Sequence, residues 1–414
     1  MKKAAAFPLL LGVSAFLTIL CQSPEALAEI PVESPPQTIV ITGNQPWQDE
    51  SLQSGIWGTL ETRERIIEAP TAIARDFPML RNWEKGTVWS FRGSRTALTQ
   101  LLRRAGLEET LVDELTSPPV LTDLKTHLEV RPDEKTILGL SNDARLEIYS
   151  HIGFPTIEDP YYYTLQFIPG GIPRMGPPPK QISPELIDLA RRLSYSDLSG
   201  NIFFSDTHFL LRKTDTEEQK VELARFLTRE LAEQAWLNVP RSRDRYREIL
   251  QYWESGGRNP NVTAVLSAAF ENQNQTRLEL EYLLPPGPRK YLNTYPSREE
   301  SNVDRYPNCF ATAFSFFSED IPPRYFDNPE PDLRTNYIPG KPPWQLGDVI
   351  VIYDTTGEWK HVCNYIAGNL VFTKNGNSPD RPWVIQKLDD VLTVYLMSEK
   401  VHAKFYRLKP GLFE

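Results

Sequence analysis

The chain has 414 residues, with 45 basic and 54 acidic side chains and a formal net charge of −9. This acidic balance, without a basic stripe, excludes broad nucleic-acid binding, because clustered Lys and Arg are needed to neutralise phosphates. An apolar fraction of 40% allows a sizeable core, and the length predicts two or three domains.

The amino terminus has the three parts of a secretory signal sequence. The chain starts Met-Lys-Lys, an apolar run extends from Ala4 to Leu20, and Ala26-Leu27-Ala28 matches a cleavage site. We predict a signal peptide over residues 1–28 and an exported chain, periplasmic or secreted, that begins near Glu29. The alternative is an uncleaved anchor, because a bilayer span needs roughly 17 residues or more. No later stretch is apolar and long enough, so no stable membrane span is expected after cleavage.

Two further regions precede the carboxyl-terminal one. Residues 29–95 form a mixed, proline-punctuated segment, and residues 96–285 show apolar side chains at helical spacing, which predicts a mainly helical domain. One helix is expected to start at Asp215 as N-cap, with Glu218 three residues later, and to extend its apolar face as far as Ala232. No repeat of fixed period is present.

The region from residue 290 to residue 414 alternates between helix and strand signals. A helix is expected after Asn308, followed by strands and one short helix. Gly368-Asn369 is a tight-turn pair, so the strands on either side of it are expected to form a hairpin. The predicted strands are Val349–Tyr353, His361–Ile366, Leu370–Lys374, Val384–Lys387 and Lys404–Leu408, with a helix over Leu388–Tyr395. The predicted fold class is α+β, with a helix packed on an antiparallel sheet in this last domain.

The candidate chemistry lies in the same region. Asn308 is a predicted N-cap, so Cys309 falls in the first turn of the helix, where free N–H groups favour a thiolate and predict a lowered thiol pKa. A thiolate attacks carbonyl carbon, and a nearby histidine can activate it and protonate the leaving amine. His361 begins an apparent central strand. We therefore predict Cys309 as nucleophile and His361 as base.

A third group should hold the imidazole in one tautomer, and the strand after the hairpin offers candidates. These candidates are Thr373, Lys374 and Asn375. A two-residue hairpin loop pairs Cys363 with Lys374, whereas a three-residue loop pairs His361 with Asn375. We favour Asn375, because an amide accepts a hydrogen bond from an imidazole N–H without adding charge.

Three stretches carry a resemblance to a known family. They are Asn308-Cys309-Phe310-Ala311-Thr312-Ala313, Leu346-Gly347-Asp348-Val349-Ile350-Val351 and His361-Val362-Cys363-Asn364-Tyr365-Ile366. Together they resemble the NlpC/P60 branch of the papain-like cysteine hydrolases. The resemblance covers residues 302–408. The chain departs from the family at the nucleophile, where the usual pattern is Asp-Cys-Ser-Gly, and at the orienting position, which is often a second histidine.

The resemblance implies an exported cysteine peptidase or amidase that cleaves an amide bond through an acyl-enzyme. By position it implies Cys309 as nucleophile, His361 as base and Asn375 as the orienting residue. It implies a peptide or amide substrate, with bacterial cell-wall peptide as the family's usual one. Neither the residues nor the resemblance implies a metal or an organic cofactor.

The alternative is a secreted interaction protein with an inactive domain. His361 and Cys363 are two residues apart on a strand and share one face, so a face turned toward Cys309 presents both side chains to it. A structural disulfide between Cys309 and Cys363 is then the competing expectation.

Overall fold

The computed structural model describes residues 51–414 except 157, 297–305, 327, 396–400 and 413–414. The predicted signal sequence lies outside these residues. The described part of the chain combines helices with antiparallel sheets, so the fold class is α+β as predicted. Within it, no helix has both the length and the apolar character for a membrane crossing.

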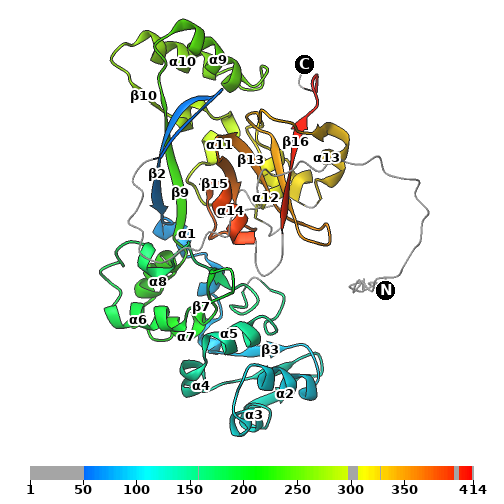
Figure 1. Ribbon diagram of the computed structural model, residues 1–414. Coiled ribbons are helices and arrows are strands. Elements are labelled where there is room, and N and C mark those ends of the chain that lie inside the picture. The colour runs from blue at the N-terminus through cyan, green and yellow to red at the C-terminus, as the bar shows by residue number, and fades with distance from the viewer. Residues whose placement is uncertain (1–50, 157, 297–305, 327, 396–400, 413–414) are drawn as a thin grey trace, which may run out of the picture. The chain divides into compact units, whose positions relative to one another are not determined.

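The first sheet joins segments that are far apart in the sequence. Its strands, in spatial order, are β1 (Ser51–Gly55), β2 (Gly58–Ile67), β9 (Glu230–Asn238) and β10 (Arg277–Glu279). β2 and β9 pair along nearly their whole length, from Thr59↔Asn238 to Ile67↔Glu230 (Figure 1). The structure thereby joins two segments that were predicted as separate, because β2 comes from the mixed segment and β9 from the region predicted as mainly helical.

Between β2 and β10 in the sequence, the chain forms most of its helices and two small sheets. The longer helices are α2 (Arg95–Arg104), α3 (Glu109–Leu115), α5 (Asn142–Tyr149), α6 (Pro184–Leu193), α8 (Glu217–Leu227), α9 (Arg243–Glu254) and α10 (Val262–Glu271). The shorter ones are α1 (Thr71–Ala74), α4 (Glu134–Gly139) and α7 (Thr207–Leu211). Two small sheets have the orders β3 (Trp89–Phe91), β5 (Leu128–Val130), β4 (Leu121–Asp123) and β6 (Leu165–Gln166), β8 (Ile202–Phe204), β7 (Tyr195–Ser196).

The helix predicted to begin at Asp215 is α8, and both of its ends differ from the prediction. Its N-cap is Thr216, whose hydroxyl accepts a hydrogen bond from the backbone N–H of Gln219 at 3.1 Å. It ends at Leu227, and the apolar residues that seemed to extend its face, Leu231 and Ala232, belong to β9. A short apolar run can form either a helix or a strand, and here the pairing with β2 makes it a strand.

The carboxyl-terminal sheet follows the prediction closely. Its strands, in spatial order, are β11 (Tyr337–Pro339), β16 (His402–Leu408), β12 (Val349–Tyr353), β13 (Trp359–Ala367), β14 (Leu370–Lys374) and β15 (Trp383–Lys387). The helices of this region are α11 (Pro286–Tyr291), α12 (Cys309–Phe314), α13 (Glu330–Asn336) and α14 (Leu388–Tyr395). The five predicted strands, the short helix over residues 388–395 and the hairpin of β13 with β14 are confirmed.

The two faces of this sheet are covered by different helices. Val349, Val351 and Val362 pack with Ala311, Ala313 and Phe314 of α12 in one hydrophobic cluster. Ile350, Ile352 and Cys363 pack with Val391 and Tyr395 of α14 in another. Alternate residues of β12 and β13 therefore point to α12 or to α14.

Candidate functional site

Cys309 opens α12, as the sequence predicts. The Asn308 side-chain oxygen accepts a hydrogen bond from the Ala311 backbone N–H at 2.8 Å, which confirms Asn308 as N-cap. The thiol is buried and accepts a hydrogen bond from the backbone N–H of Val362 on β13. Burial raises the pKa of Cys309 to about 11, although Val362 and the charge of Lys374 act in the opposite direction. The prediction of a lowered thiol pKa is therefore wrong. Desolvation of the buried thiolate raises the pKa by more than the free N–H groups of this six-residue helix lower it.

His361 lies on β13, two residues after the strand begins, and its side chain is fully buried. Its Nε2 and the Thr373 hydroxyl are 2.7 Å apart, and its ring stacks on Tyr395 with centroids separated by 4.3 Å. Nδ1 has no hydrogen-bond partner within the described residues. Burial lowers the pKa of His361 to about 3, so the imidazole is neutral at physiological pH.

The sheet separates the two predicted catalytic side chains by face. Val362 and Asn364 face α12, where the Asn364 amide donates to the Ala313 carbonyl at 3.0 Å. His361 therefore faces α14 together with Cys363. The Cys309 sulfur approaches β13 at Val362, the residue that lies between His361 and Cys363 in the sequence. No hydrogen bond joins Cys309 to His361 within the described residues.

Asn375 does not occupy the orienting position that was predicted for it. It lies one residue beyond β14, and its Nδ2 donates to the Gln386 side-chain oxygen at 2.9 Å. The imidazole instead meets Thr373, another of the three candidates. The hairpin has the two-residue loop, with Ala367 opposite Leu370, but an irregularity after Tyr365 shifts the following pairs to the register of the three-residue loop.

The competing expectation of a disulfide is not realised. Cys309 and Cys363 are both free thiols, and both are buried. Burial raises the pKa of Cys363 well above its ordinary value, and the nearby charge of Cys309 acts in the same direction. The two thiols are thus close enough to interact electrostatically without being bonded.

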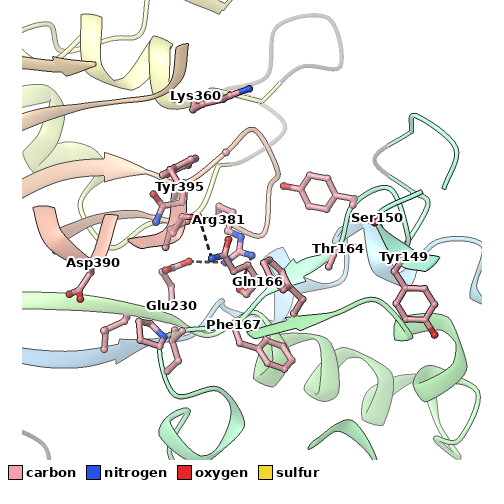
Figure 2. Close-up of a pocket in the computed structure, with 18 of the residues that line it drawn as sticks. Tyr149, Ser150, Thr164, Gln166, Phe167, Glu230, Lys360, Arg381, Asp390 and Tyr395 are labelled. Atoms are coloured by element: carbon pink, nitrogen blue, oxygen red, sulfur yellow. Dashed lines mark hydrogen bonds and ion pairs between the residues drawn. The ribbon is translucent and has the colours of Figure 1, made fainter. Parts of the chain in front are cut away.

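A cavity of about 830 Å³ adjoins this site (Figure 2). Tyr395 and Asn375 line it, so the ring that stacks on His361 also forms part of the cavity wall. Arg381, which also lines it, donates to Glu230 at 2.9 Å and to the Gln166 carbonyl at 3.1 Å. Aromatic side chains contributed by the middle of the chain include Tyr161, Tyr162, Tyr163 and Phe167.

Apart from Asn375, the cavity residues named above were not predicted from the sequence. Glu230 starts β9, Arg381 lies between β14 and β15, and Tyr395 ends α14. No motif connects segments that lie so far apart in the chain. The run Tyr161-Tyr162-Tyr163 is a local feature of the sequence, but it is as typical of a core as of a binding site.

One cluster of carboxylates could hold a cation. Glu64, Glu233 and Asp390 each place an oxygen within 4.8 Å of the others. The Lys387 ammonium lies 3.2 Å from Glu64 and 3.0 Å from Glu233, so a positive charge of the chain already fills this position. Burial raises the pKa of Glu233 to about 7 and that of Asp390 to about 6, although Lys387 opposes both shifts.

Comparisons of the chain with protein-family models, with curated proteins and with solved structures give no match. The interpretation of the site therefore depends on its own geometry and on the resemblance of three short sequence stretches.

Proposed function

We propose that the carboxyl-terminal region is a thiol hydrolase of the papain-like type. Cys309 attacks the carbonyl carbon of a peptide or amide substrate, and His361 accepts the proton of the thiol and returns it to the leaving amine. Because the two side chains lie on opposite faces of β13, this transfer requires a path past the end of the β13–β14 pairing, which stops at Asn364↔Phe372. The C–N bond breaks as the thioester forms, and water then releases the acid and regenerates the thiol. Export through the predicted signal sequence would bring this activity to peptides outside the cytoplasm, bacterial cell-wall peptide among them.

The observation that carries this proposal is the hydrogen bonding of His361. One ring nitrogen meets Thr373 at 2.7 Å, whereas the other is buried without a partner in the described residues. Buried polar atoms without partners are rare, and each one calls for an explanation. A base needs one nitrogen held by an orienting group and the other free to take a proton, which is the state of this imidazole.

The surroundings of the thiol support the same interpretation. The sulfur of Cys309 lies against the backbone N–H of the residue that follows His361. A negative charge on Cys309 would raise the pKa of Tyr395, and the ring of Tyr395 stacks on His361. The cavity is lined by the same tyrosine, so a substrate bound there lies close to the imidazole.

One observation favours a second candidate function, a non-catalytic binding domain. Both Cys309 and His361 are buried, and their pKa values, about 11 and about 3, keep both groups neutral at physiological pH. In this alternative the cavity holds a ligand and the thiol is only a part of the core. The alternative makes no use of the free nitrogen of His361.

Cleavage of peptide amides by two cysteine variants tests the proposal. Cys309→Ser is expected to abolish hydrolysis of a peptide library that includes cell-wall peptides, because a serine hydroxyl is a much weaker nucleophile at this site. Cys363→Ser is the matched control, since it removes the neighbouring buried thiol and should leave the rate within about twofold. Product release is followed by mass spectrometry. Equal rates for wild type and Cys309→Ser would contradict the proposal.

A further inference from the structure

Lys374 is a charged side chain that the proposed reaction does not yet use. It is the last residue of β14 and is fully buried. Its ammonium donates to the carbonyl oxygens of Gly376 at 3.1 Å and Ser378 at 2.9 Å. No carboxylate lies within ion-pair distance of it among the described residues. A lysine in such surroundings lacks a direct counter-ion, which is costly unless another negative charge comes close.

The position of Lys374 places it on the same face of the sheet as Cys309. It pairs with Trp383 across β14 and β15, and its Nζ lies 5.9 Å from the centroid of the Trp383 ring. Trp383 donates through its indole N–H to the hydroxyl of Thr312 at 2.9 Å. Thr312 is one helical turn after Cys309 in α12.

The pairing of β13 with β14 gives the same location independently. The pairing of the two strands ends at Asn364↔Phe372. If each strand is followed for two more residues in the same register, Val362 comes opposite Lys374. The backbone N–H of Val362 donates to the Cys309 thiol. The thiol and the ammonium therefore lie at the same end of the gap between these two strands, on the side covered by α12.

We infer that Lys374 is the counter-cation of the Cys309 thiolate, so that the reactive state of the site is a thiolate beside an ammonium. When the lysine amine is neutral, the S–H proton passes to it. When the lysine is already an ammonium, the proton passes to the imidazole of His361. In both cases the sulfur keeps the electron pair that attacks the substrate. This inference rests on the proposed function, because it assigns the charge that activates its nucleophile.

The electrostatics of both groups agree with this assignment. Burial lowers the pKa of Lys374 to about 7, and Asp380 and Cys309 oppose that shift while Arg381 adds to it. In turn, the charge of Lys374 lowers the pKa of Cys309 against the effect of burial. Cys309 on α12 and Asp380 and Arg381 before β15 are the charged or titratable groups that act on this ammonium. A lysine near neutral pKa can gain or lose its proton at physiological pH.

The pH dependence of thiol alkylation tests the inference without any substrate. The parent protein carries Cys21→Ser and Cys363→Ser, so that Cys309 is its only cysteine. Lys374→Gln keeps donors for the two carbonyls but has no charge, Lys374→Met fills the volume without charge, and Lys374→Arg keeps the charge. Iodoacetamide modification is timed by intact mass across a pH series. The shape of the profile is compared, because limited access to the thiol scales all rates equally.

At neutral pH, both uncharged variants are expected to react at least about tenfold more slowly than the parent, which corresponds to one unit of thiol pKa. Their rates should rise about tenfold per pH unit, whereas the parent shows a shoulder near neutrality and Lys374→Arg stays close to the parent. Uncharged variants with the parent profile would overturn the inference, including when their melting temperature is lower, because that pattern is the one expected of a structural lysine. Failure to find any hydrolysed substrate would refute the proposed function and leave this result intact.

Discussion

A His361→Gln variant is expected to form its acyl-enzyme about 10²–10⁴-fold more slowly than wild type, because a glutamine amide cannot accept the thiol proton. Glutamine fills much of the imidazole volume and can still bond to the Thr373 hydroxyl, which in the structure lies 2.7 Å from Nε2. The loss should therefore be confined to the rate. Single-turnover kinetics with a peptide found in the cysteine-variant screen measure it directly.

Thr373→Val is the matched control for this variant. It keeps the imidazole and removes only the hydroxyl that holds Nε2. We expect a smaller loss of rate, because the base is present but no longer held in one tautomer. A His361→Gln protein that acylates as fast as wild type would exclude this histidine as the base.

The His361→Gln variant is also expected to change how the stability of the protein depends on pH. The pKa of His361 is about 3 in the folded protein, below its ordinary value of 6.5, so the unfolded state binds more protons between these values. Stability from the neutral imidazole is thus complete above the unfolded pKa and is lost as the pH falls toward the folded one. The loss approaches about 1.4 kcal/mol per pH unit for one group. The free energy of unfolding is measured across acid pH for wild type and for His361→Gln, and the difference between the two gives this contribution.

Asp206→Ala is expected to lower the free energy of unfolding by about 3–5 kcal/mol, the usual result of breaking a buried ion pair. Asp206 is fully buried and accepts hydrogen bonds from Arg145 at 2.5 Å, from Tyr149 at 3.0 Å and from Tyr161 at 2.9 Å. Its removal leaves the Arg145 guanidinium in the core without its carboxylate. Urea unfolding followed by tryptophan fluorescence measures the loss.

Two controls define the cause of that loss. Asp188→Ala breaks an exposed pair with Arg191, 2.5 Å apart, and should cost less than about 1 kcal/mol. Arg145→Met combined with Asp206→Leu removes both buried charges and should recover most of the stability. Equal losses for Asp206→Ala and Asp188→Ala would show that the buried pair contributes no more than a surface one. Because Tyr149 and Tyr161 line the cavity, Asp206→Ala should also weaken ligand binding there.

The sequence was sufficient to predict the strands of the last sheet but not the faces of their side chains. Gly368-Asn369 marked the hairpin, and the strand limits follow from β-rich runs between turn residues. In β13, however, every residue from His361 to Ala367 is buried, so no alternation shows which of them face α12. The register depends on an irregularity after Tyr365 that the sequence does not mark. The resulting register would place Asn375 opposite His361, but the pairing of β13 with β14 ends at Asn364↔Phe372, and Thr373 lies against the imidazole instead.

Long-range pairing limited the prediction in the rest of the chain. Apolar residues after Leu227 fit helical spacing, and only the pairing with β2 makes them a strand. The cavity has the same origin, since Glu230, Arg381 and Tyr395 meet only after three separate segments have packed. Burial also reverses the expected pKa of Cys309, because a short helix start cannot offset full desolvation of a thiolate.

The central claim is that Cys309 is the nucleophile, and covalent trapping tests it most directly. Wild-type protein is incubated with a peptidyl chloromethyl ketone, which alkylates an activated thiol, and the adduct is located by peptide mapping. We expect one adduct on Cys309, much slower labelling in His361→Gln, and no adduct on Cys363 while the protein is folded. Equal labelling of both cysteines, or labelling of neither until the protein is denatured, would contradict the claim.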